Sequence, residues 1–159
     1  MSRPSSAGRT IWGGRLLPKT TNHTSAPDLN RASEGKLPGH IGLVVTSVEP
    51  GRLTGRLEVR PDLVAHTGYL LAGALLSCLD ILCAYGVSSA WPEDADGFTT
   101  AEVKSNFLGT VREGAVTFEA ELLHGGRLTQ VWDARARDEA TGKLMAVFRC
   151  TQILLYPRS

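Results

Sequence analysis

Asp80 is the residue in this sequence whose surroundings most favour a chemical role. It is the only charged residue between Asp62 and Glu93, and the segment 69–90 around it is rich in Leu, Ala and Cys. A helix over this segment has no solvated face to which a carboxylate could turn, so burial would raise the pKa of Asp80. Carboxyl groups with perturbed pKa values are common at functional sites. We therefore interpret Asp80 as a functional carboxylate rather than a surface acid.

The start of the same segment is a second candidate feature. Gly68 and Gly73 bracket the residues 69–72, which offer no side chain to cap the first turn of a helix. Unpaired N–H groups at a helix N-terminus suit a carbonyl oxygen that develops negative charge, as in an oxyanion hole. A glycine-mediated turn into an ordinary helix explains the same residues, so this feature gains weight only together with Asp80.

The spacing of the two features predicts a second copy of the chain. Ala72 and Asp80 are eight residues apart, which is about 12 Å along a helix. One helix cannot place both groups on a single carbonyl. If both act, they come from two chains, and function then requires a homodimer with its helices side by side.

The elements that position these residues are mostly strands. Residues 53–60, 116–122 and 132–137 alternate apolar with polar residues, as half-buried strands do, and Gly- or Pro-containing turns separate them from their neighbours. The segment 69–90 is apolar nearly all round, which indicates a buried helix. A membrane span is the competing interpretation, and Asp80, Gly73, Gly86 and the strands on both sides argue against it. The expected elements are strands 41–48 and 53–60, a helix 69–90, and strands 98–108, 116–122, 132–137 and 144–156.

This order predicts an α+β fold, with a curved antiparallel sheet of about six strands around one long buried helix. One helix cannot cover both faces of such a sheet. The other face must be solvated or covered by another chain.

Charge and composition limit the partners and the domain organisation. The 159 residues carry 17 Lys and Arg against 16 Asp and Glu, a net charge of +1, which argues against a nucleic-acid-binding surface. Residues 1–36 carry a net charge of +4 and show no sustained apolar period, so we expect a flexible N-terminal arm. Residues 37–159 carry the remaining −3 and form the predicted domain.

The cysteines and histidines do not predict a metal site. The three Cys residues lack a C-x-x-C pair, and the four His residues lack metal-ligand spacing. No apolar run of secretory type follows Met1. We therefore expect a reducing compartment, the cytoplasm, and no metal.

Three stretches together resemble a known family. Residues 66–86 (HTGYLLAGALLSCLDILCAYG), 98–132 (FTTAEVKSNFLGTVREGAVTFEAELLHGGRLTQVW) and 138–155 (DEATGKLMAVFRCTQILL) are similar to hotdog-fold acyl-CoA thioesterases of the phenylacetate-pathway type. The likeness covers roughly residues 37–156. It rests on the succession of these stretches at the right spacing, and it implies the hotdog fold.

The resemblance also implies roles for individual residues. Asp80 falls where the family keeps its catalytic carboxylate, a general base toward water or a nucleophile. Ala72 and Gly73 fall at the two glycines whose N–H groups polarise the thioester carbonyl. Thr100 matches a Ser or Thr that orients the water or the acid, and His66 lies close to a polar position before the helix.

Further positions follow from the same resemblance. Gly126, Arg127 and Thr129 lie in a hairpin that often contacts coenzyme A phosphates in the family. The family's usual His-Gly-Gly is replaced by Leu71-Ala72-Gly73, which removes a histidine but keeps the backbone N–H groups. The apolar residues Leu70, Leu71, Leu75 and Phe107 are expected to line a pocket for a medium-chain or aromatic acyl group.

The implied function is hydrolysis of an acyl-CoA thioester to free acid and coenzyme A. No cofactor is expected apart from the coenzyme A of the substrate, and the chain is expected to form a homodimer at minimum, or a homotetramer. The alternative is an acyl-CoA-binding hotdog protein without catalysis, which the missing histidine motivates.

Overall fold

Six strands form one antiparallel sheet in the order β3-β4-β6-β7-β8-β5. The structure is a computed structural model that describes residues 11–12, 15–16 and 25–157. The sheet strands are β3 (Val44–Glu49), β4 (Arg52–Glu58), β5 (Gly97–Phe107), β6 (Ala115–Gly125), β7 (Thr129–Asp138) and β8 (Leu144–Leu155). The predicted order of two strands, one helix and four strands is confirmed. A separate two-stranded pair, β1 (Ile11–Trp12) with β2 (Arg15–Leu16), was not predicted.

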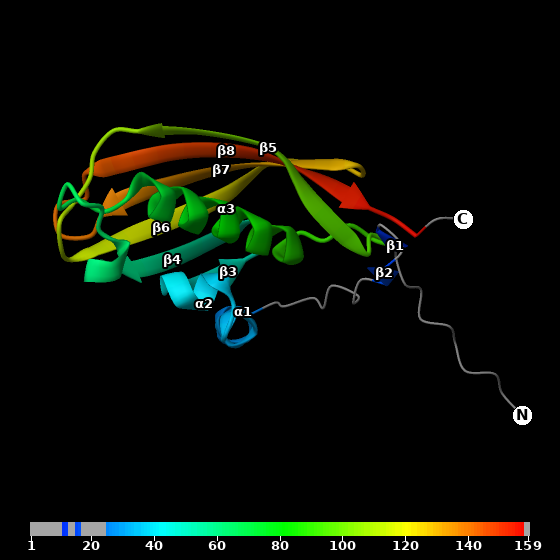
Figure 1. The fold of residues 1–159 in the computed structure, drawn as a ribbon. Coiled ribbons are helices and arrows are strands. Elements are labelled where there is room, and N and C mark those ends of the chain that lie inside the picture. The colour runs from blue at the N-terminus through cyan, green and yellow to red at the C-terminus, as the bar shows by residue number, and fades with distance from the viewer. Residues whose placement is uncertain (1–10, 13–14, 17–24, 158–159) are drawn as a thin grey trace, which may run out of the picture.

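The curved sheet wraps around helix α3 (Ala72–Ser89), as Figure 1 shows. The helix begins later than the predicted residue 69 because the residues before it pair with other segments. The N–H of Leu70 donates to the carbonyl of Val111, and that of Leu71 donates to the carbonyl of Leu63. By length and composition α3 could cross a membrane, but eight of its residues are buried against the sheet, as in a core helix.

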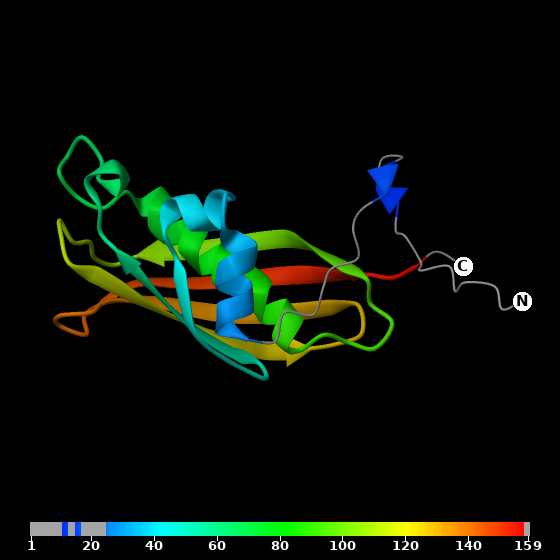
Figure 2. The same ribbon diagram turned by 90° about the horizontal axis from the view of Figure 1, so that it is seen from below.

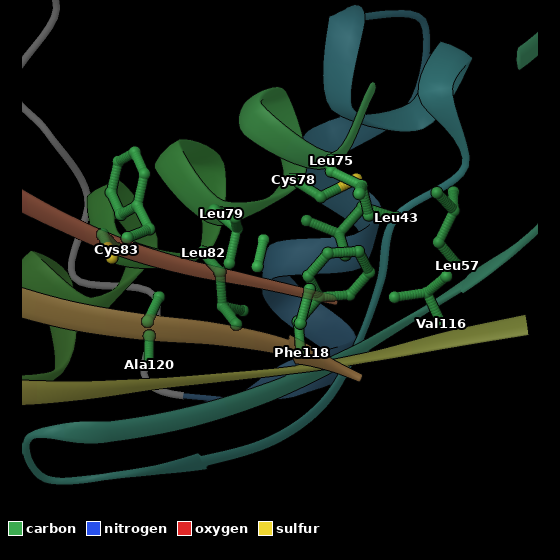
Figure 3. Close-up of a cluster of buried hydrophobic side chains, with 14 of the residues drawn as sticks. Leu43, Leu57, Leu75, Cys78, Leu79, Leu82, Cys83, Val116, Phe118 and Ala120 are labelled. Carbon is green, nitrogen blue, oxygen red and sulfur yellow. The ribbon is translucent and has the colours of Figure 1, made fainter. Parts of the chain in front are cut away.

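The core lies between α3 and the concave face of the sheet. Alternate residues of β4, β6, β7 and β8 point toward α3, as the period-two pattern predicts. Figure 3 shows part of this cluster, with Phe118 of β6 beneath the helix residues. Largest among the fully buried side chains are Trp132 and Phe118. Burial of these apolar surfaces is the main force that holds helix and sheet together.

The outer face of the sheet carries ion pairs that join strands to each other or to the turn after β7. Arg56 of β4 binds Glu139 at 2.6 Å, and Arg149 of β8 binds Asp133 of β7 at 2.5 Å. Arg52 of β4 pairs with Glu119 of β6. The face that α3 leaves uncovered is therefore polar and charged.

Helix α1 (Ala26–Ser33) corrects the predicted arm over residues 1–36. Leu29 is only 1% exposed and belongs to the core. The Asn30 side chain bonds both the N–H and the carbonyl of Val45, at 2.8 and 2.9 Å, and Ser33 hydrogen-bonds Tyr85 at 2.6 Å. Figures 1 and 2 show α1 and helix α2 (Leu37–Ile41) beside α3, near β3.

The sequence contains a local signal for α1 that an apolar period does not show. Ser25 is the N-cap and accepts from the N–H of Asp28, and Pro27 lies in the first turn. Leu29 is the only large apolar residue of this eight-residue helix, so no periodicity can arise. Residues 25–36 thus belong to the folded unit. Residues 1–10, 13–14 and 17–24, the rest of the predicted arm apart from β1 and β2, lie outside the described residues.

Candidate active site

The N-terminus of α3 presents two backbone N–H groups to the surface. Leu71 is the N-cap and has no side-chain oxygen that could bond them. The first N–H groups of a helix have no partner within the helix. Ala72 and Gly73 are exposed, so their N–H groups can receive an oxygen of another molecule. Partial positive charge at the helix N-terminus favours an oxygen that becomes negative.

Asp80 lies in the middle of α3 and is partly buried. Its Oδ1 is buried, and no hydrogen-bond partner for it exists among the described residues. Burial raises the pKa of the Asp80 carboxyl, and the Thr100 hydroxyl acts in the opposite direction. A carboxylate in this state attracts a proton more strongly than an exposed aspartate does, which suits a base.

Thr100 lies on β5, and its hydroxyl is close enough to Asp80 to lower the pKa of that carboxyl. Its cross-strand partner is Gln152 of β8, and its hydroxyl donates to Oε1 of Gln152 at 3.0 Å. The register shifts between Thr100 and Glu102. Bulges of this kind re-aim side chains beside functional sites. The structure thus brings together Asp80 and Thr100, two of the predicted site residues.

Ala72 and Gly73 are not brought to Asp80 within one chain. Helix α3 is continuous over Ala72–Ser89, so the spacing of about 12 Å expected from the sequence applies. His66 lies in an exposed turn before the helix, which the bridge between Val64 and Leu70 closes. No described residue hydrogen-bonds its imidazole, and the turn does not place it at Asp80.

Gly126, Arg127 and Thr129 lie at the opposite end of α3 from Ala72. Gly126 and Arg127 line a surface cavity of about 550 Å³ together with residues that follow the helix, Ala90 and Pro92. The guanidinium of Arg127 lies 5.7 Å from the ring centre of Tyr156, and the Tyr156 hydroxyl donates to the Arg127 carbonyl. The N–H of Gly126 donates to the carbonyl of Thr129 at 2.9 Å.

The predicted acyl-pocket residues divide into two sets. Leu70 and Leu75 are 4% and 1% exposed, so they belong to the chain's own core and cannot line a pocket. Leu71 and Phe107 are 53% and 43% exposed and remain available, as does Tyr69 at 39%. Arg112 stacks over the Tyr69 ring at 4.3 Å. Sequence reasoning missed this stacked pair beside the helix start.

Sequence reasoning also missed two buried glutamines near the site. Gln152 and Gln130 are 0% and 1% exposed and face each other across β8 and β7. Both occupy inward-facing positions of the period-two pattern, where apolar residues are the rule. A glutamine at such a position is the signal in the sequence that could have identified them. No group of three His, Cys, Asp or Glu residues in the described part of the chain could hold a metal ion.

The chain is similar to known thioesterases in sequence. The profile of the thioesterase superfamily matches residues 67–145. The 1,4-dihydroxy-2-naphthoyl-CoA hydrolase of Listeria monocytogenes is 34% identical over 111 residues, 70% of this chain and 89% of the relative. The proofreading thioesterase EntH of Klebsiella pneumoniae is 28% identical over 113 residues, 70% of this chain and 80% of the relative.

Solved structures share the fold. A thioesterase from Pseudomonas aeruginosa superimposes with a TM-score of 0.78 at 24% identity, covering 86% of this chain and 97% of that chain. The PaaI protein from the phenylacetic acid degradation operon of E. coli gives a TM-score of 0.73 at 20% identity, covering 86% and 96%. The chain has a helix wrapped by an antiparallel sheet, and its relatives are named as thioester hydrolases. It therefore belongs to the thioesterase superfamily, has the hotdog fold of that family and is a thioester hydrolase.

Proposed function

We propose that the protein hydrolyses an acyl-CoA thioester to a free acid and coenzyme A. The observation that carries this proposal is the partly buried Asp80, with an unpartnered Oδ1 and a raised pKa, on a helix whose N-terminal N–H groups are free of side-chain caps. The relative from Listeria is named for a CoA thioester, which supports coenzyme A as the leaving group. The exposed apolar side chains of Tyr69, Leu71 and Phe107 favour a medium-chain or aromatic acyl group.

In the proposed reaction the carbonyl oxygen accepts hydrogen bonds from the N–H groups of Ala72 and Gly73. Asp80 takes a proton from water, whose oxygen attacks the carbonyl carbon, and the oxyanion forms at the helix N-terminus. The C–S bond then breaks, and the thiolate receives the proton from Asp80. Direct attack by Asp80, followed by hydrolysis of the resulting anhydride, gives the same products. Neither route requires a further cofactor.

A homodimer completes this site in the proposal. Ala72 and Asp80 of one helix are about 12 Å apart, and the hairpin with Arg127 lies at the far end of α3. A second, antiparallel copy would bring the helix start of one chain to Asp80 of the other, whose hairpin would lie about 15 Å farther along its helix. The edge strand β5, with Val103 45% exposed, offers a surface for such pairing. We propose a homodimer at minimum, or a homotetramer, in the cytoplasm, where the three unpaired cysteines stay reduced.

Asp80→Asn tests the assignment of the base. The variant keeps the shape of the side chain but cannot take a proton from water, so release of free thiol from a panel of acyl-CoA thioesters should be lost. Asp133→Asn is the matched control, because Asp133 lies on the outer face in an ion pair with Arg149. Turnover that persists in a folded Asp80→Asn enzyme would overturn the role of Asp80.

Mixed dimers test the two-chain site. Ala72→Pro removes one N–H at the first helical position, where proline is tolerated, and each single variant alone should be inactive. Co-expressed Asp80→Asn and Ala72→Pro chains can form one intact site per mixed dimer, which restores about a quarter of the activity after random pairing. If the site lay within one chain, mixing would restore nothing.

A further inference from the structure

Gln152 is a fully buried amide whose main partner is a predicted site residue. It is 0% exposed, and its Oε1 accepts from the Thr100 hydroxyl at 3.0 Å. Its Nε2 lies 3.5 Å from Sγ of Cys150, a weak acceptor. Burying an amide costs free energy unless it is hydrogen-bonded. The bond from Thr100 is therefore the strongest polar contact of this side chain among the described residues.

The Thr100 hydroxyl has one proton and two acceptors within its surroundings. One acceptor is Oε1 of Gln152, and the other is the Asp80 carboxyl, whose pKa the hydroxyl lowers. One proton cannot serve both acceptors at once. When it points to Gln152, the lone pairs of the Thr100 oxygen are turned to the Asp80 side, where they can accept a bond from a water or from a protonated carboxyl.

We propose that Gln152 is a positioning residue of this site: by accepting the Thr100 proton it keeps that proton from Asp80, and so leaves the carboxylate a stronger base. The catalytic consequence rests on the proposed function of Asp80, whereas the competition for the proton does not. The bulge that follows Thr100 supports the inference, because it aims this side chain independently of the regular pleat.

Gln130, the neighbouring buried amide, has no such coupling to Asp80 and provides a matched comparison. Gln130 pairs in register with Gln152 and is equally buried. Its Nε2 donates to the carbonyl of Ala90 at 2.7 Å, and its Oε1 accepts from the indole of Trp132 at 2.9 Å. These bonds tie the end of α3 to β7 and involve no titratable group.

Other ionisable groups near Asp80 are few. The thiols of Cys83 on α3 and Cys150 on β8 lie close enough to interact with its charge, and the charge of Asp133 on β7 also acts on Cys83. The hydrogen bond to Cys150 and burial raise the pKa of Cys83. Charged residues of the other strands packed against α3 take hydrogen bonds or ion pairs elsewhere: Arg52, Arg56, Glu58, Glu102, Lys104, Glu119 and Glu121.

A titration of the Asp80 carboxyl carbon by NMR tests the proposal on the full-length protein. The signal is assigned by its loss in Asp80→Asn. Gln152→Met removes the acceptor and frees the Thr100 proton for Asp80, so the midpoint should move to lower pH. Gln130→Met should leave the midpoint in place although it lowers stability. If the Met variant does not fold, Gln152→Ser, which is too short to reach Thr100, should move the midpoint in the same direction.

A second experiment, in the Thr100→Val variant, distinguishes a positioning role of Gln152 from a role in core packing. In Thr100→Val there is no proton to compete for, so adding Gln152→Met should no longer move the midpoint. A shift of equal size in both backgrounds, or no shift on removing Gln152 alone, would overturn the proposal. The acid limb of kcat/KM for an acyl-CoA should follow the same pattern in an active enzyme. Absence of hydrolysis would count against the proposed function, and the carboxyl titration would still decide the role of Gln152.

Discussion

Gly86 of α3 lies against the indole of Trp132, with no space between them for a side chain. A Cβ at residue 86 would approach the Cη2 and Cζ3 atoms of the ring to 2.6 Å. Trp132 is 0% exposed, and its Nε1 is fixed by the bond to Gln130. The indole therefore cannot turn away, and this glycine sets how closely the helix approaches β7.

Gly86→Ala is expected to destabilise the protein although alanine is the better helix former. Overpacking of a filled core costs about 1–3 kcal/mol, which exceeds the gain of about 1 kcal/mol from helix propensity. Gly73→Ala is the matched comparison in the same helix, because a Cβ there meets only Leu71, at 3.6 Å. Thermal unfolding should show a lower Tm for Gly86→Ala and an equal or higher Tm for Gly73→Ala. An unchanged Tm for Gly86→Ala would contradict the close packing.

Leu29→Ala is expected to destabilise the domain, because α1 is part of its core. Leu29 is 1% exposed, and truncation of a buried leucine costs about 2–5 kcal/mol. Leu37→Ala is the control eight residues later, since Leu37 is 63% exposed and a surface change costs at most about 0.5 kcal/mol. Urea denaturation measures both. Equal urea midpoints for the two variants would mean that residues 25–36 are a dispensable arm and not part of the folded domain.

Particular residues show what the sequence can and cannot predict here. The alternation at Trp132, Ala134 and Ala136 and the apolar segment around Asp80 were sufficient for the order of elements, because each pattern is local. Helix α1 was missed since it contributes one large apolar residue, Leu29, and its signals are a cap and a proline. Periodicity reports a buried face and cannot report a single buried residue.

The site was predictable in part for the same reason. The spacing of Ala72 and Asp80 on one helix follows from helix geometry alone. The contact of Thr100 with Gln152 depends on the register of β5 against β8 and on the bulge after Thr100, which no short stretch of sequence determines. The burial of Leu70 and Leu75 likewise depends on how the loop before α3 packs.

Two aspartates, Asp80 and Asp133, should make the stability of the protein depend on pH in opposite directions. Burial raises the pKa of Asp80 above 3.8 in the folded state, so the folded state binds more protons than the unfolded one above that pH. Stability then falls as pH rises from 3.8 through the folded pKa. The Tm of Asp80→Asn should therefore exceed that of the wild type by a margin that grows as pH rises from 3.8 through the folded pKa of Asp80.

Asp133 provides the control of opposite sign. The hydrogen bond from Arg149 lowers the pKa of Asp133 below 3.8, so its contribution to stability is present above that pH and is lost as pH falls through the folded pKa. Asp133→Asn should be less stable than the wild type at neutral pH, and the difference should shrink below pH 3.8. Curves that stay parallel for both variants would contradict the two assignments.

Arg127→Ala is expected to weaken binding of the coenzyme without slowing the chemical step. The guanidinium stands over Tyr156 beside a cavity of about 550 Å³, and an exposed contact to a phosphate is worth about 1 kcal/mol, or about fivefold in KM. The KM for an acyl-CoA should rise while kcat stays unchanged. An acyl-pantetheine, which lacks the nucleotide phosphates, should show no change. Arg137→Ala, at the other end of β7 with a bond to the Gly142 carbonyl, should alter neither substrate's KM. Equal losses with both substrates would mean that Arg127 supports the site through its contacts with Tyr156 and not through phosphate.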